Sequence, residues 1–134
     1  MNYLPHTEAQ QLFDEAKKAS ENTYSPYSHF PVGAAVLAGD GSIIRGTNVE
    51  NASYGLTICA ERTALGHAIS AGKKDIKAIA VYCRTTGVAP CGACRQFILE
   101  FGGDIVVIFK SGDELLQKTI QELLPFSFTK ESMG

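Results

Sequence analysis

The chain has 134 residues and a mass of 14.4 kDa, and we expect residues 1–134 to form a single domain. Apolar residues make up 45% and charged residues 19%, which excludes an intrinsically disordered or fibrous chain. The formal net charge is −2 and basic residues stand singly or in pairs, so we expect no nucleic-acid partner. The longest apolar run, residues 78–83, is far shorter than the roughly 18 residues of a membrane span. We therefore expect a cytoplasmic protein without a membrane partner.

The first predicted element is an amphipathic helix. Thr7 and Gln10 have the spacing of a capping box, and apolar residues recur at helical intervals as far as Ala19. The helix must end before Pro26, because proline disfavours helical backbone in the residue that precedes it. Residues 22–28 have the composition of a loop.

A β-hairpin and a second helix follow. Residues 32–37 and 42–47 are two candidate strands, and the Asp-Gly pair between them is typical of a hairpin turn. Residues 59–71 are rich in alanine and place apolar side chains on a common face. Gly72 stands where the C-terminal cap of that helix belongs.

The second half of the chain predicts a parallel core. Residues 76–81 and 104–110 are mostly apolar without alternation, which is typical of strands covered on both faces. A helix over residues 92–101 lies between them, so we expect a parallel βαβ unit with the hairpin as an antiparallel edge. Residues 115–120 fit helix and strand equally, and residues 121–124 predict a short helix. The predicted fold class is α/β.

Three of the four cysteines are spaced to bind a metal ion. Cys91 and Cys94 are three residues apart at a helix start, which puts both thiolates on one face. Cys59 also begins a predicted helix, where free backbone N–H groups and the helix dipole favour a thiolate. Three sulfur ligands suit Zn²⁺ and leave a fourth position open for water. We interpret Cys83 as a small buried side chain near a strand end.

A closed structural zinc site is the alternative interpretation of these cysteines. It needs a fourth protein ligand, and His67 lies about 12 Å from Cys59 along one helix, too far to share an ion. Spacing does not rule out His29. We favour the open site, because a domain of this length has enough core to fold without a metal.

Two charged residues follow Cys59. Glu61 can lean from the first helical turn toward the open metal position, where a carboxylate is a candidate general base. Its alternative role is to complement the helix dipole. Arg62 shares the face of Cys59 and can hydrogen-bond the sulfurs, which offsets the net charge of −1 of three thiolates and Zn²⁺. Its alternative is a solvated surface arginine.

The cysteine motifs are part of a larger set of five segments. Residues 59–62 (Cys-Ala-Glu-Arg) and 90–96 (Pro-Cys-Gly-Ala-Cys-Arg-Gln) look like the zinc signature of the cytidine deaminase family, in its short form with three cysteine ligands. Residues 27–33, 48–54 and 122–125 resemble further motifs of the enzymes that act on free nucleosides. The resemblance covers nearly the whole chain and implies the three-layer cytidine-deaminase-like fold, with helices on both faces of a mixed five-stranded sheet.

The resemblance also implies an activity. This is the zinc-dependent hydrolytic deamination of free cytidine and deoxycytidine to uridine and deoxyuridine, with release of ammonia, in pyrimidine salvage. It implies that Cys59, Cys91 and Cys94 hold Zn²⁺ and that Glu61 is the catalytic proton shuttle. Glu61 would take a proton from the attacking water, deliver one to N3 of cytosine and help protonate the leaving amino group.

Five residues are implied to contact the substrate. If the segment is extended, Asn48 and Glu50 project to the same side and can meet adjacent ribose hydroxyls. Without the resemblance this segment would be interpreted as a polar loop. Phe30 and Val49 are implied to lie against the pyrimidine ring, a role that sequence alone does not distinguish from core packing. The backbone N–H of Ala60 is implied to hold the pyrimidine carbonyl.

The resemblance implies a homotetramer whose active sites borrow groups from neighbouring subunits. Tyr54 and Phe128 match positions that reach across subunits in related enzymes. Phe126 is close enough in sequence to take the place of Phe128. Neither composition nor periodicity indicates the assembly.

Two other functions are compatible with the zinc signature. A deaminase of another small nucleoside, such as a blasticidin-type antibiotic, is disfavoured by the Asn-Val-Glu-Asn segment at residues 48–51 and by Phe30. A non-catalytic, zinc-stabilised binding module would hold metal but release no ammonia. Ammonia release from cytidine, deoxycytidine and cytosine would separate these functions.

Overall fold

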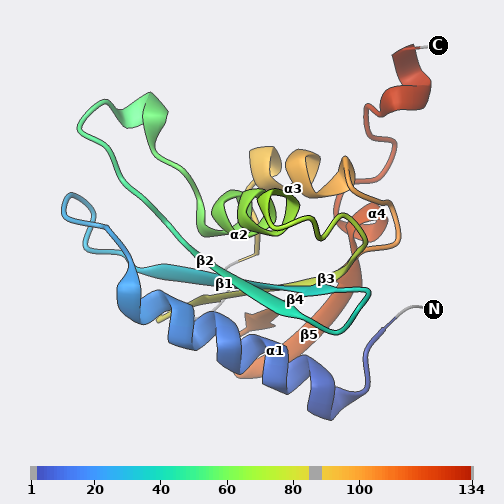
Figure 1. The fold of residues 1–134 in the computed structure, drawn as a ribbon, viewed down its shortest axis with the longest axis horizontal. Helices are drawn as coiled ribbons and strands as arrows, with labels where there is room; N and C mark the ends of the chain where they lie inside the picture. Colours follow the sequence, from blue (N-terminus) through green and yellow to red (C-terminus); the bar gives the residue numbers. More distant parts are fainter. Residues whose placement is uncertain (1–2, 85–88, 134) are drawn as a thin grey trace.

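The predicted strands assemble into one sheet between two layers of helices (Figure 1). The computed structural model describes residues 3–84 and 89–133. The strands are β1 (Val32–Ala38), β2 (Ile43–Thr47), β3 (Ile76–Cys83), β4 (Val106–Ser111) and β5 (Glu114–Thr119). The α-helices are α1 (His6–Ala19), α2 (Ala60–Ser70), α3 (Gly92–Leu99) and α4 (Ile120–Leu123), and 3-10 turns cover Ser20–Asn22, Tyr54–Leu56 and Lys130–Met133.

The sheet is mixed, with the strand order β2-β1-β3-β4-β5. Strand β1 pairs antiparallel with both β2 and β3, and β4 pairs antiparallel with β5. Strands β3 and β4 are parallel and are connected through α3. The predicted α/β class, the parallel unit and the antiparallel hairpin edge are therefore confirmed, and the mixed five-stranded sheet implied by the resemblance is observed.

Each face of the sheet has its own core. Helix α1 covers one face, whereas α2 and α3 cover the other (Figure 1). Because side chains alternate along a strand, Ala35 and Val106 belong to the α1-side core. Their neighbours Val36 and Val107 belong to the core beneath α2 and α3. Helices thus pack on both faces, as expected.

Two glycines allow the helices to approach the sheet closely. A Cβ at Gly33 would lie 2.0 Å from the backbone oxygen of Ala16 in α1. A Cβ at Gly46 would lie 2.3 Å from the backbone nitrogen of Ala64 in α2. These backbone contacts leave no room for a side chain. The second of them fixes α2, and with it Cys59 at its start, directly above β2.

The prediction of a capping box at the start of α1 is wrong, because the box does not form. The helix begins at His6 with Pro5 as its N-cap, and no side chain there makes a capping hydrogen bond. Proline fixes φ near −65° and favours the entry to a helix. The N-cap is therefore Pro5 instead of Thr7, so the helix starts two residues earlier than the capping box predicts, and Thr7 lies inside its first turn.

The ambiguous segment, residues 115–120, contains the end of a strand and the start of a helix. It continues β5 as far as Thr119, and α4 begins at the next residue. A capping box forms here instead. The Glu122 backbone N–H donates to Thr119 Oγ1 at 3.2 Å, and the Thr119 backbone N–H donates to Glu122 Oε1 at 2.8 Å.

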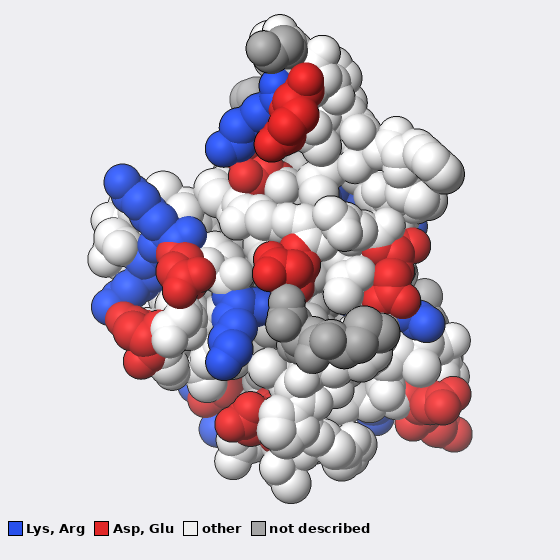
Figure 2. Space-filling model, turned by 90° about the vertical axis from the view of Figure 1, so that its right-hand side faces the viewer, with Lys and Arg blue, Asp and Glu red and all other residues white. Residues whose placement is uncertain are grey.

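The exterior mixes charges of both signs. Figure 2 shows acidic and basic side chains next to one another on the face it presents. Of the ion pairs among the described residues, the two shortest join Arg45 with Glu15 at 2.6 Å and Lys73 with Asp40 at 2.7 Å. Within residues 3–84 and 89–133, no helix combines the length and the apolar character needed to cross a membrane.

Candidate metal centre

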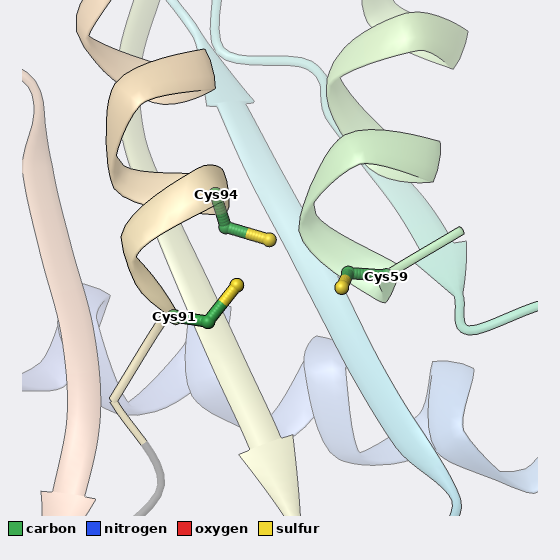
Figure 3. Close-up of side chains that lie close together, drawn as sticks. All are labelled: Cys59, Cys91 and Cys94. Atoms are coloured by element: carbon green, nitrogen blue, oxygen red, sulfur yellow. The ribbon is translucent and has the colours of Figure 1, made fainter. Parts of the chain in front are cut away.

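Three cysteines meet where two helices begin. Cys59 is the N-cap of α2, Cys91 is the N-cap of α3, and Cys94 lies in the first turn of α3. Their sulfur atoms all lie within 4.8 Å of one another, and Figure 3 shows the three side chains pointing toward a common space. The predicted convergence of the two helix starts is confirmed.

The local electrostatics favour thiolates in this cluster. Cys59 and Cys91 have extended backbones, and neither side chain caps its helix. A hydrogen bond from Cys94, aided by the guanidinium of Arg62, lowers the pKa of the Cys59 thiol to about 5. The same hydrogen bond raises the pKa of Cys94, because its proton is held between the two sulfurs. A cluster that readily carries negative charge suits a soft divalent cation.

Arg62 lies against the sulfur cluster, as predicted. Its Nη2 donates to Cys59 Sγ at 3.5 Å, and proximity to that sulfur raises the pKa of the guanidinium. Its Nε is buried and has no hydrogen-bond partner among the described residues. A partly buried guanidinium that donates to Cys59 fits a site where thiolate charge must be offset.

The donor set fits zinc with an open position. Within the described residues, the metal-binding group contains the three cysteines and neither His29 nor His67. Three thiolates are the donor set of a catalytic zinc site, which would leave a fourth position for water, whereas a closed structural site needs four protein ligands. Cys83 is buried at the end of β3 and lies outside the group, as predicted.

Glu61 is a buried carboxyl beside this group. It lies in the first turn of α2 and is only 5% exposed. Burial raises the pKa of its carboxyl and the charge of Cys59 adds to the effect, while hydrogen bonding by its own backbone amide opposes it. A solvated carboxylate that only complements the helix dipole would be exposed.

A cavity of about 210 Å³ opens onto Glu61 and two of the three cysteines, Cys59 and Cys91. Of the predicted site residues, it brings together Asn48, Cys59, Ala60, Glu61 and Cys91. Its other lining residues were not identified from the sequence: Val32, Thr57, Ile58 and Ala89. The only available signal was their position, since three of them come within two residues of a zinc-signature motif.

Asn48 and Glu50 both bind the backbone of the preceding loop. Asn48 is buried; its Oδ1 accepts from the Val32 N–H at 3.1 Å, and its Nδ2 donates to the Phe30 oxygen at 2.9 Å. The Glu50 carboxylate accepts from the backbone N–H of Ser28 at 3.1 Å. Hydrogen bonds from Ser28 lower the pKa of Glu50. Both side chains therefore hold the loop that carries Phe30.

The remaining predicted contact residues lie outside the cavity of a single chain. Phe30 and Val49 are 40% and 39% exposed, and Tyr54 and Phe128 are 90% and 62% exposed. Phe126 is fully exposed and has a left-handed backbone with φ 53°. These side chains are available to a ligand or to a neighbouring molecule.

Two residues of α3 that directly follow Cys94 connect the start of this helix to the C-terminal segment. Arg95 donates through Nε to the Pro90 oxygen and through Nη1 to the Leu123 oxygen, both at 2.8 Å. Gln96 donates through Nε2 to the Phe128 oxygen at 2.8 Å. Their position directly after Cys94 in the motif was the signal that could have identified them.

Comparisons with known proteins agree with this geometry. Residues 6–110 match the family model described as the cytidine and deoxycytidylate deaminase zinc-binding region. A cytidine deaminase from Halalkalibacterium halodurans is 52% identical over 128 residues, which cover 93% of this chain and 97% of that protein. The crystal structure of cytidine deaminase from Burkholderia pseudomallei superposes with a TM-score of 0.85 at 45% identity, covering 93% of this chain and 100% of that chain.

A blasticidin-S deaminase from Bacillus cereus is similar at a lower level. It is 31% identical over 129 residues, which cover 90% of this chain and 91% of that protein. The higher identity to proteins described as cytidine deaminases supports the nucleoside interpretation over the antibiotic one. The match over most of the chain, together with the three-cysteine cluster, shows that this protein belongs to the zinc-dependent cytidine and deoxycytidylate deaminase family.

Proposed function

We propose that the protein is a zinc-dependent enzyme that hydrolytically deaminates cytidine and deoxycytidine. One observation carries the proposal: the buried carboxyl of Glu61 lies on the wall of the cavity that also contains Cys59 and Cys91. A zinc-stabilised binding module has no need for a buried acid or a cavity beside its metal. A hydrolase needs both, because substrate, water and a proton carrier must meet there.

The proposed reaction converts cytidine and water into uridine and ammonia. The water oxygen bonds to C4 of the ring, the bond between C4 and the amino nitrogen breaks, and ammonia leaves. When bound, zinc supplies Lewis-acid activation of that water. Glu61 moves both water protons: the first goes to N3, where it stays in uridine, and the second goes to the departing amino nitrogen.

The backbone and the loop residues are proposed to orient the nucleoside. Ala60 is the first residue of α2, so its N–H has no acceptor within the helix and is available to the pyrimidine carbonyl. Phe30 and Val49 offer exposed apolar surface to the ring. Asn48 lines the cavity, and Asn48 and Glu50 bind the sugar hydroxyls.

We propose a homotetramer in which Tyr54 and Phe128 complete a neighbouring site. The cavity of about 210 Å³ is below the usual range of about 300–1,000 Å³ for ligand pockets, which supports a site completed by further groups. Both side chains are largely exposed on the single chain, and exposed aromatic residues are typical of protein interfaces. Phe126 is the alternative to Phe128.

A role in pyrimidine salvage in the cytoplasm is proposed from the same chemistry. The reaction recovers uridine from free cytidine. The three cysteine thiols that are proposed to bind zinc must stay reduced, and cytosolic conditions keep thiols in that state. In an oxidising compartment these thiols could be oxidised and lost as metal ligands, because the sulfur atoms of Cys59, Cys91 and Cys94 lie close together.

The test is ammonia release by the purified zinc-loaded protein. We expect turnover of cytidine and deoxycytidine, and little or none of cytosine or blasticidin S, because neither presents a plain ribose to Asn48 and Glu50. Preferential turnover of blasticidin S would establish the antibiotic deaminase instead. Bound zinc without ammonia from any substrate would establish a binding module.

A further inference from the structure

Glu50 accepts three hydrogen bonds from one turn of the preceding loop. Its Oε1 accepts from the backbone N–H groups of Tyr27 at 3.0 Å and Ser28 at 3.1 Å. Its Oε2 accepts from the hydroxyl of Ser28. Each carboxylate oxygen has about two acceptor positions, so Oε1 is saturated, and Oε2 keeps one position for a further donor. The direction of that position is set by the Ser28 hydroxyl.

Ser28 also holds the residue that carries the neighbouring ring. Its Oγ accepts from the Phe30 backbone N–H at 3.1 Å, while Asn48 holds the Phe30 oxygen at 2.9 Å. Between them His29 has a left-handed backbone with φ 55°, a conformation that a non-glycine residue keeps only when its surroundings impose it. One hydroxyl thus joins the Glu50 carboxylate to the Phe30 backbone.

We propose that Ser28 is a positioning residue of the nucleoside site. It aims the unsaturated acceptor of Glu50 at a sugar hydroxyl and holds Phe30 beside the ring. The inference rests on the proposed contact of Glu50 with the sugar. Because Ser28 is itself exposed and contributes little to the core, its effect is on substrate binding, not on folding.

The experiment compares Ser28→Ala with Ser28→Thr on two substrates. Cytidine has hydroxyl groups at the 2′ and 3′ positions of the sugar, and 2′,3′-dideoxycytidine lacks these two groups. We expect Ser28→Ala to raise KM for cytidine about tenfold with kcat within about threefold, since a hydrogen bond to a charged group is lost from binding. The dideoxy substrate keeps the ring contact with Phe30 but offers Glu50 neither hydroxyl, so its kcat/KM should fall by no more than about threefold, the part lost through Phe30 alone. Ser28→Thr should restore the cytidine KM, because the hydroxyl returns and the exposed site has room for a methyl group.

The control is Ser42→Ala. The Ser42 hydroxyl also donates to a carboxylate, that of Asp40, but in the turn between β1 and β2. We expect wild-type kinetics from this variant. Equal losses on both substrates by Ser28→Ala, or an unchanged KM for cytidine, would overturn the proposal.

A second variant separates this inference from the proposed role of Glu50. If Glu50→Gln raises KM for cytidine and Ser28→Ala does not, the sugar contact holds and the role of Ser28 is refuted. If Glu50→Gln leaves that KM unchanged, the proposed sugar contact is refuted, and the role of Ser28 with it. In the double variant we expect an increase well below the product of the two single increases, because both changes act through one carboxylate.

Discussion

The two faces of the sheet share the same strands but differ in what they bury. The α1-side core consists of apolar side chains such as Leu12 and Ile108. The α2 side has an apolar core of similar character, yet Glu61 is buried at its margin and the cysteines gather at its helix starts. The proposed catalytic groups therefore lie at helix N-termini on one face, and none of them lies on the face that α1 covers.

The largest expected difference concerns the ligands themselves. Cys94→Ser should weaken zinc binding by more than the roughly hundredfold that loss of an outer hydrogen-bond partner costs, because a thiolate ligand is removed. Deamination should fall with the zinc content. Metal analysis of the purified protein and ammonia release measure the two effects.

Cys83→Ala is the control for this prediction. Cys83 is buried like Cys94 but lies outside the metal-binding group, so the variant should retain its zinc and lose some stability. Loss of zinc from Cys83→Ala, with zinc retained by Cys94→Ser, would contradict the ligand assignment.

Two matched leucines sharpen the comparison of the faces. Leu12 and Leu65 are both fully buried, in α1 and α2 respectively. Each change to alanine should lower the free energy of unfolding by about 3 kcal/mol, because it leaves a cavity. Only Leu65→Ala should also lower kcat, since Leu65 lies one turn after Glu61. Denaturant unfolding and steady-state kinetics test both; an equal loss of kcat from Leu12→Ala would contradict the division.

Arg95→Gln should have a smaller effect. The change removes the two hydrogen bonds that Arg95 donates, one to the Pro90 oxygen and one to the Leu123 oxygen. The free energy of unfolding should therefore fall by about 1–3 kcal/mol. Zinc should also dissociate faster, because Pro90 directly precedes a ligand. Chelator competition measures the release rate. An unchanged rate with reduced stability would show that Arg95 supports the C-terminal segment only.

Arg45→Gln should have the smallest effect of all. Its ion pair with Glu15 is short, but both side chains remain partly exposed. Solvent screening limits such pairs, so the free energy of unfolding should change by less than about 1 kcal/mol, with no effect on zinc or turnover. A loss as large as that of Arg95→Gln would show that the edge strand β2 depends on this pair.

The parts that sequence predicted best are governed by local rules. The run of apolar residues in β3 identifies a buried central strand, because few other structures tolerate it. The spacing of Cys91 and Cys94, with Cys59 at another helix start, predicted the metal group, because this arrangement of cysteines is typical of zinc ligands. The signal lies in one short segment for the strand and in two short segments, one at each helix start, for the metal group.

Other features depend on contacts between distant segments. Strand β5 is an edge strand of mixed exposure, so its sequence lacks the alternation that marks a strand. The hydrogen bonds of Asn48 and Glu50 to the loop before β1 join residues about twenty positions apart. No local pattern reports such pairing, and for the same reason Thr57 and Ile58 were not predicted to line the cavity.

The most direct test is turnover by Glu61→Gln, with Glu8→Gln as its control. Both glutamates lie in the first turn of a helix, but Glu8 is exposed in α1 and Glu61 is buried in α2. We predict that Glu61→Gln keeps its zinc and its fold while kcat for cytidine falls by about 10²–10⁴, and that Glu8→Gln matches the wild type. Unchanged ammonia release by zinc-loaded Glu61→Gln would contradict the account.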